Sequence, residues 1–210
     1  FEYYTIKYLS TIFNEDLFII EQNPIYKNSN MPIYRMKNEN NIINIYYQNT
    51  MPLKMPRMLI EHDNNLNSLG NEMILIPDII MEFKNRTDNS YRYVILDSKY
   101  RTNFNSSDDR YKMLGYLYNL GENNIPLILV YYDFEKDNPM KPKVYKYKDT
   151  DNGYLVSLKI GNKFSNNLSY DLLLKIIREF IEPTFWGYSI TIWKDDTKFK
   201  LVRLRNLTML

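Results

Sequence analysis

The chain has 210 residues, 44% of them hydrophobic and 25% charged, with a formal net charge of +2, which excludes a disordered chain and gives no general signal for nucleic acid. It contains no cysteine, which excludes disulfides and thiolate zinc sites and fits a reducing, cytoplasmic location. No apolar run reaches the roughly 18 residues of a membrane span, so we expect no membrane partner.

The first predicted element is an amphipathic helix over Phe1–Phe13. At about 100° per residue, its inward-facing stripe contains Glu2, Ile6, Leu9 and Phe13. Glu2 therefore heads an apolar stripe. It is either a helix-start acid favoured by the helix dipole or part of a metal or active site, and the sequence leaves both readings open.

The next segments are less regular. Leu17–Glu21 fits a helix or a strand, and the Asn-rich segment Asn28–Asn40 predicts a loop. Ile42–Gln48 alternates well enough for a strand. Leu59–Asn71 has low apolar content and predicts a connection, in which His62, the single histidine, is expected to be a solvated residue.

Two strand-like runs follow, Ile74–Phe83 and Tyr91–Arg101, and each carries one aspartate among apolar residues. Aspartate is depleted in strands, so both need an explanation. If Asn85–Ser90 is the turn between the runs, the hairpin is symmetric and Asp78 lies across from Asp97. Facing residues of an antiparallel pair share a face, with Cβ atoms about 4.5–5.5 Å apart.

Side chains alternate along a strand, so Lys99 is expected on the same face as Asp97, and Ser98 on the other. Two facing carboxylates repel unless a cation lies between them. Hard oxygen ligands at this spacing suit Mg²⁺. The hairpin therefore predicts a divalent-metal site with a lysine beside it. The alternative is a buried ion pair of Lys99 with Asp97 or Asp78.

A helix is predicted over about Asp108–Leu120, with Ser107, Asp108 or Asp109 as its cap and with a buried side formed by Tyr111, Leu114, Leu117 and Tyr118. Lys112 and Tyr116 lie one turn apart and share a face. Ile125–Tyr132 is a nearly continuous apolar run, as expected for a strand buried on both faces. Strand, helix and strand predict a βαβ unit with parallel strands.

The remaining chain predicts a second hairpin from Lys143–Lys148 and Tyr154–Ile160, a helix over Ser169–Ile181, and a basic segment with two short strands over Thr184–Leu210. No repeat or clear linker divides the chain. We therefore expect a single domain over 1–210, with a core of about 1–132 and an extension over 133–210. Because the chain opens on Phe1 rather than Met, it can be a fragment of a longer protein.

The motifs Pro77-Asp78 and Asp97-Ser98-Lys99, in this order of elements, resemble the PD-(D/E)xK nuclease superfamily. The phrase Asp97-Ser98-Lys99-Tyr100, followed by a helix with Tyr116, is similar to the McrC-like nuclease subunit of 5-methylcytosine-specific McrBC restriction systems, as is the opening Phe1-Glu2-Tyr3. The resemblance covers roughly residues 1–132. It implies an α/β (α+β), restriction-endonuclease-like fold, an αβββαβ core with a mixed sheet flanked by helices, followed by a C-terminal hairpin and helix.

The resemblance also implies the roles of the site residues. Asp78, Asp97 and Lys99 would be catalytic. Mg²⁺, or Mn²⁺ in its place, would be held by Asp78, Asp97 and the main-chain carbonyl of Ser98, with Glu2 as a candidate further ligand. Lys112 and Tyr116 would line the phosphate side. The family has glutamine where this chain has Lys112, which puts fine positioning in doubt.

The function implied is Mg²⁺-dependent DNA endonuclease, acting as the nuclease subunit of a modification-dependent restriction system with an AAA+ motor as partner. The chain itself has no phosphate-binding Gly-rich loop. Two alternatives are a stand-alone RecB-type or structure-selective nuclease and a non-catalytic adaptor that binds DNA or the motor. For DNA contacts the sequence offers two basic groups: Lys141, Lys143, Lys146 and Lys148 with Tyr145 and Tyr147, and Lys194, Lys198, Lys200, Arg203 and Arg205. An ordinary solvated strand edge explains the first group equally well.

Overall fold

One mixed sheet forms the body of the protein. In the computed structural model, which describes residues 1–12, 18–24, 31–49, 59–73, 75–101, 106–120, 125–132, 143–146 and 154–160, eight strands are ordered β1-β2-β3-β6-β7-β8-β10-β9. Their bounds are β1 Phe18–Gln22, β2 Tyr34–Lys37, β3 Asn41–Tyr47, β6 Ile79–Asn85, β7 Tyr91–Lys99, β8 Leu127–Tyr132, β9 Lys143–Lys146 and β10 Tyr154–Ile160. β8 is parallel to both β7 and β10, and the other neighbours are antiparallel.

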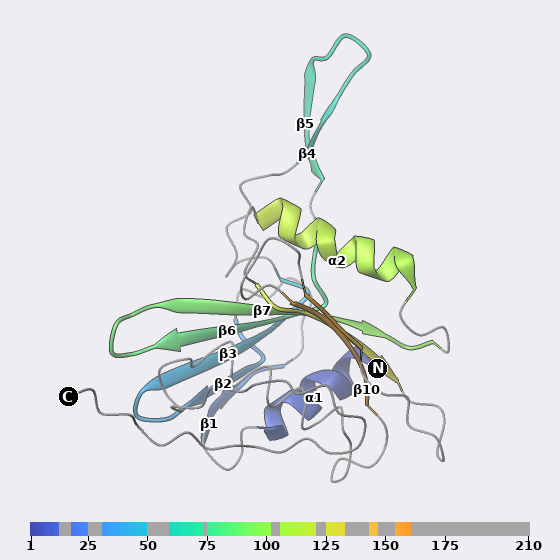
Figure 1. Ribbon diagram of the computed structural model, residues 1–210. Helices are drawn as coiled ribbons and strands as arrows, with labels where there is room; N and C mark the ends of the chain where they lie inside the picture. Colours follow the sequence, from blue (N-terminus) through green and yellow to red (C-terminus); the bar gives the residue numbers. More distant parts are fainter. Residues whose placement is uncertain are drawn as a thin grey trace, which may run out of the picture.

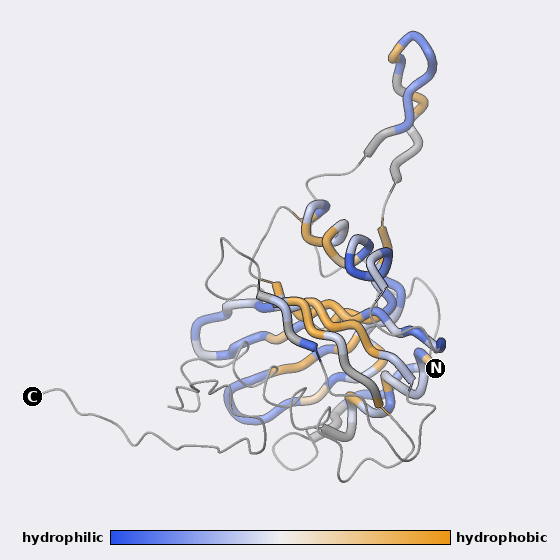
Figure 2. The backbone as a smooth tube through the Cα atoms, turned by 45° about the vertical axis from the view of Figure 1, so that its right-hand side comes forward, coloured by the Kyte–Doolittle hydropathy of each residue, from blue (hydrophilic) through white to orange (hydrophobic). Residues whose placement is uncertain are grey.

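Two helices lie on opposite faces of this sheet, α1 (Glu2–Ile12) on one and α2 (Ser107–Leu120) on the other (Figure 1). Side chains alternate along β7, so Leu96 packs in the core that contains α1, and Ile95 in the core beneath α2. The central strands are accordingly apolar (Figure 2). The predicted α/β (α+β) class is confirmed, and its αβββαβ order is present as α1, β3, β6, β7, α2 and β8, with further strands around it.

The sequence reading of the N-terminal half was partly wrong. Leu17–Glu21, which fitted either element, contributes the strand β1, and the segment read as a loop, Asn28–Asn40, contains the strand β2. β2 pairs with both β1 and β3. β2 has only four residues, two of them charged, so it is too short and too polar to show a strand pattern in the sequence.

The expected connection Leu59–Asn71 is instead a hairpin of β4 (Leu59–His62) and β5 (Ser68–Met73). It projects beyond α2 and is largely hydrophilic (Figures 1 and 2). Its strands pair with each other rather than with the main sheet, and their sequences lack the alternation of apolar and polar residues by which a half-buried strand is recognised. His62 is exposed in it, and its Nδ1 lies 2.8 Å from the carbonyl oxygen of Leu66.

The prediction for the buried side of α2 was mostly wrong. Leu117 is buried, but Tyr111, Leu114 and Tyr118 are among the exposed large apolar side chains. The side facing the sheet is formed by Met113, Tyr116, Leu117 and Leu120. Both sides of this helix are rich in Tyr and Leu, so periodicity alone did not identify the buried one.

The C-terminal hairpin is confirmed where it is described, since β9 pairs antiparallel with β10. Phe13, Ser169–Ile181 and Thr184–Leu210 lie outside the described residues, so the predictions made for them stay predictions. Among the described helices, none combines the length and apolarity needed to cross a membrane.

Candidate active site

The predicted register of the central hairpin is confirmed. Ile79 pairs with Leu96, and at the turn Asn85 N–H donates to the carbonyl oxygen of Ser90 at 3.0 Å. Continuing this register by one residue beyond the last pair brings Asp78 opposite Asp97. The two aspartates therefore meet where β6 begins and β7 ends.

Asp97 is fully buried and faces α2. Lys99, two residues along the same strand, forms an ion pair with its Oδ2, which confirms that the two side chains share a face. From α2, Lys112 Nζ lies 2.8 Å from Oδ1, and Tyr116 donates to the same oxygen at 3.3 Å. One carboxylate thus contacts two ammonium groups and a phenol. The ion pair that was the alternative to a metal site is present in this structure.

Asp78 is bound to the backbone of the neighbouring strand. Its Oδ2 accepts a hydrogen bond from Ser98 N–H at 2.8 Å, while only 9% of the residue is exposed. Burial, and secondly the negative charge of Asp97, raise the pKa of Asp78 to about 6, although the Ser98 hydrogen bond acts to lower it. The site therefore contains a carboxylate whose charge is disfavoured by its surroundings, which is a feature of functional sites.

Lys112 and Tyr116 both contact Asp97 from α2, and their role on the phosphate side stays a prediction. Burial alone would lower the pKa of Lys112, but its hydrogen bond to Asp97 and the charge of that acid outweigh burial, so the pKa is raised. The pKa of Tyr116 is also raised, first by burial and then by the charge of Asp97. At neutral pH Lys112 is a cation and Tyr116 a hydrogen-bond donor.

Glu2 lies on the α1 side of the sheet. Its Oε2 accepts hydrogen bonds from Tyr47 OH at 2.5 Å and from Gln48 Nε2 at 3.3 Å. Its charge contributes to the raised pKa of Asp78. Within the described ranges, however, no group of three or more His, Asp or Glu side chains could hold a metal. The structure therefore does not gather Glu2 with Asp78 and Asp97 into one ligand set.

The donor atoms at the hairpin fit Mg²⁺ in type. Asp78 and Asp97 supply carboxylate oxygens from adjacent strands, and their repulsion, visible in the raised pKa of Asp78, is what a bound cation relieves. Asp78 Oδ1 accepts no hydrogen bond from the described residues. Both oxygens of Asp97 contact lysines. A metal at Asp97 would therefore have to displace or share at least one of these contacts.

A buried network that the sequence did not reveal holds α2 in place. Asp109, at 5% exposure, accepts hydrogen bonds from Tyr131 OH at 2.6 Å and Ser106 Oγ at 2.9 Å and pairs with Arg101. Burial alone would raise the pKa of Asp109, but these partners lower it. Ser106, rather than the expected Ser107, Asp108 or Asp109, caps the helix, because its Oγ accepts from Asp109 N–H. The network joins the start of α2 to β8 and so positions Lys112.

Replacing Asp109 by asparagine is expected to destabilise the fold by about 1–3 kcal/mol, because Arg101 loses its partner and a buried network is broken. Urea unfolding at neutral pH measures the change. Asp108→Asn is the matched control, since Asp108 is the preceding, exposed acid, and should stay within about 0.5 kcal/mol of the parent. Equal effects of the two substitutions would contradict the role given to Asp109.

Of the basic groups considered for DNA contacts, only Lys143, Tyr145 and Lys146 are in described residues. They belong to β9, the last strand in the order of the sheet. Lys143 and Tyr145 are exposed, and Arg110 of α2 lies over the Tyr145 ring, 5.7 Å from its centroid. The other lysines and arginines of both groups, Lys141, Lys148, Lys194, Lys198, Lys200, Arg203 and Arg205, lie outside the described residues.

Among known proteins, the chain shows similarity to solved structures only. No protein-family model matches the chain, and no curated protein matches it. Among solved structures, the chain is similar to one in a half-complex from the tetradecameric assembly of Thermococcus gammatolerans McrB AAA+ hexamers with bound McrC, with a TM-score of 0.33 and 16% identity. The likeness covers 63% of this chain and 30% of that one.

Proposed function

We propose that this protein is a Mg²⁺-dependent DNA endonuclease that acts as the nuclease subunit of an McrBC-type restriction system. The observation that carries the nuclease proposal is the meeting of Asp78 and Asp97 at the end of one hairpin, with Lys99 against Asp97. This is the arrangement that the motif resemblance implies. The assignment to a restriction system rests on the sequence resemblance alone.

In this proposal Asp78 and Asp97, with the carbonyl of Ser98, hold the metal. When bound, Mg²⁺ would polarise a phosphate oxygen and lower the pKa of a water molecule. Lys99 lies beside Asp97 and would orient the attacking water and balance negative charge that develops on the phosphate. Lys112 and Tyr116 approach Asp97 from α2 and would contact the phosphate from that side. Ser98 N–H fixes the orientation of Asp78.

A second candidate is a nuclease fold without catalysis, used as an adaptor for DNA or for a motor. The contact of two lysines with Asp97 favours it, because a carboxylate neutralised in this way needs no metal. The complete set of Asp78, Asp97 and Lys99 favours the enzyme. A stand-alone nuclease would use the same chemistry and differ only in needing no partner.

Incubation of supercoiled plasmid with Mg²⁺ tests the enzyme, with EDTA as the control. Nicked or linear products that appear only with Mg²⁺ support the nuclease; no cleavage with Mg²⁺ or Mn²⁺, with or without a motor, favours the adaptor. Adding an AAA+ partner and its nucleotide separates the two nuclease candidates. Cleavage that depends on both additions supports the subunit of a restriction complex, and full cleavage without them supports a stand-alone enzyme.

Lys112→Gln is expected to lower the Mg²⁺ concentration needed for half-maximal cleavage several-fold. The Lys112 ammonium competes with a metal for Asp97 Oδ1, whereas a neutral amide can donate a hydrogen bond without carrying a charge. Titration of the cleavage rate with Mg²⁺ measures this. Lys7→Gln, at an exposed lysine of α1, is the control. An unchanged or higher Mg²⁺ requirement in Lys112→Gln would contradict competition at Asp97.

A further inference from the structure

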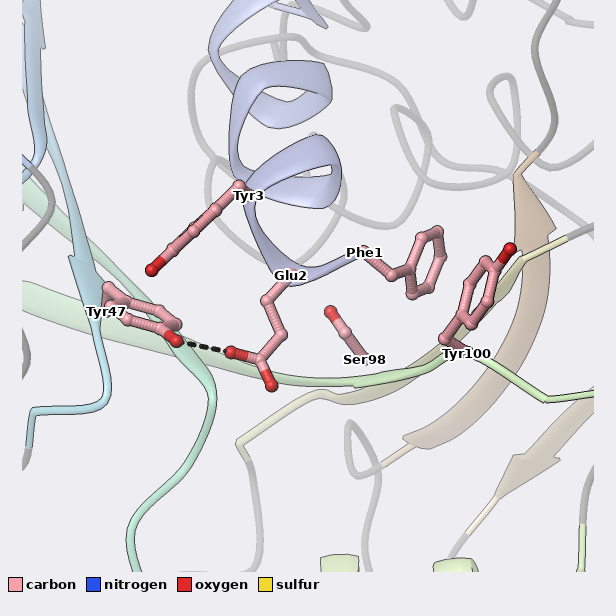
Figure 3. A pocket seen from close by; sticks show the side chains of 6 residues that line it. All are labelled: Phe1, Glu2, Tyr3, Tyr47, Ser98 and Tyr100. Carbon is pink, nitrogen blue, oxygen red and sulfur yellow. Dashed lines mark hydrogen bonds between the residues drawn. The ribbon is translucent and has the colours of Figure 1, made fainter.

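A hollow lies on the other side of β7 from Asp97 and Lys99. It has a volume of about 400 Å³ and is lined by Phe1, Glu2, Tyr3, Tyr47, Ser98 and Tyr100 (Figure 3). This volume lies within the range of small-molecule sites, about 300–1,000 Å³. Four of the six lining residues are aromatic, and the two others can form hydrogen bonds. The hollow therefore suits a flat ligand with a polar edge.

The aromatic walls are held in place by one another. Tyr3 packs edge-on against Tyr47, with ring centroids 5.5 Å apart. On the other side, Phe1 lies 6.0 Å from Tyr100, and both rings contact Tyr132. Tyr3 and Tyr100 nevertheless remain 55% and 65% exposed. Two sets of rings thus present accessible surface on either side of the hollow.

The polar groups that line the hollow can form further hydrogen bonds. Ser98 is 8% exposed, and its hydroxyl has no hydrogen-bond partner in the structure while it points toward the space between Glu2 and Phe1 (Figure 3). A buried hydroxyl left without a partner is costly. Glu2 Oε2 is bound by Tyr47 and Gln48, and none of the described residues donates to Oε1. Both groups can therefore accept from a ligand.

The hollow is adjacent to the proposed catalytic site. Ser98 lines it with its side chain while its backbone N–H binds Asp78. Tyr100 directly follows Lys99 in the chain. A ligand that places a ring in the hollow would therefore have its next group at the end of β7, beside the acids and the lysine. A phosphate there would be attracted by Lys99.

We propose that this hollow binds one unpaired nucleobase of the strand whose phosphate lies at Asp78 and Asp97. The proposal rests on the proposed nuclease function and adds a substrate class to it: DNA with an unpaired nucleotide next to the bond that is cleaved. Aromatic side chains stack on any base, which gives affinity without sequence preference. The Glu2 carboxylate and the Ser98 hydroxyl form hydrogen bonds to the edge of the base that would pair with the complementary strand in a duplex. This edge is free only when the base is unpaired.

The test is a binding measurement in EDTA, where no cleavage occurs, with a short oligothymidine strand that carries one 2-aminopurine. We expect the single strand to bind more tightly than the same strand in a duplex and its aminopurine fluorescence to be quenched by stacking. Tyr100→Ala should weaken single-strand binding at least about fivefold and relieve the quenching. Tyr3→Ala removes the opposite wall and should act in the same direction.

Tyr111→Ala is the matched control, because Tyr111 is 70% exposed and lies on α2; it should bind as the parent does. Equal affinity for single strand and duplex, or unchanged quenching in both pocket variants with folded circular dichroism spectra, would overturn the proposal. If the pocket variants lose binding while Mg²⁺ never yields cleavage, the nuclease proposal fails and the base site stands. If Mg²⁺ yields cleavage and both pocket variants bind normally, only the base site fails.

Discussion

Asp78→Asn is expected to abolish Mg²⁺-dependent cleavage, by about a thousandfold or more, and at the same time to stabilise the protein at pH 7.5. The substitution removes a proposed metal ligand. It also removes a charge that the folded protein disfavours, since burial and the neighbouring Asp97 raise the pKa of Asp78 to about 6. The asparagine side-chain oxygen can still accept the hydrogen bond from Ser98 N–H.

The raised pKa of Asp78 determines whether its replacement raises or lowers the stability of the protein at a given pH. The pKa of Asp78 is about 6 in the folded protein and about 3.9 in an unfolded chain. The stabilising contribution of the protonated acid is therefore present below about pH 4 and is lost as the pH rises through 6. At pH 7.5 the free energy of unfolding of Asp78→Asn, measured with urea, should exceed that of the parent by about 1–2 kcal/mol. At pH 4 the two proteins should have the same free energy of unfolding. A variant that is less stable than the parent at pH 7.5 would contradict the raised pKa.

Asp97→Asn is expected to abolish cleavage to the same extent but to destabilise the fold. Asp97 is fully buried and is the partner of Lys99 and Lys112, so its loss leaves two ammonium groups close together without a carboxylate. Removing one partner of a buried pair costs about 3–5 kcal/mol, and less where the other partners reach water. The Lys99 and Lys112 side chains are 17% and 38% exposed, so we expect about 1–2 kcal/mol.

Each of the two asparagine variants serves as a control for the other. Both lose cleavage, yet one gains and the other loses stability, so loss of activity cannot be attributed to unfolding in the Asp78 variant. Plasmid cleavage and urea unfolding on the same preparations make the comparison. Normal cleavage by either variant would show that the catalytic assignment is wrong.

The central hairpin could be predicted from sequence because its signals are local. The polar turn Asn85–Ser90 sets the register, and the register alone brings Asp78 to Asp97. Alternation along β7 then places Lys99 and Ser98 on opposite faces. Each step depends on residues within one continuous stretch, and each agrees with the structure.

Features that depend on distant partners could not be predicted in this way. Asp109 gave only a weak capping signal, because its partner Tyr131 is 22 residues away. The contact of Lys112 with Asp97 depends on how α2 is rotated, and the Tyr and Leu residues on both sides of the helix hide that rotation. The hollow is formed by α1, β3 and the end of β7, so no single segment reveals it.

Metal binding measured without cleavage is the most direct test of the claim that Asp78 and Asp97 together hold one divalent ion. Mg²⁺ and Mn²⁺ should each raise the melting temperature of the parent protein at pH 7.5 by several degrees, as expected for a ligand present far above its Kd. Asp78→Asn and Asp97→Asn should each lose this shift, and Asp108→Asn should retain it. An equal shift in all four proteins, or no shift in the parent, would contradict the claim.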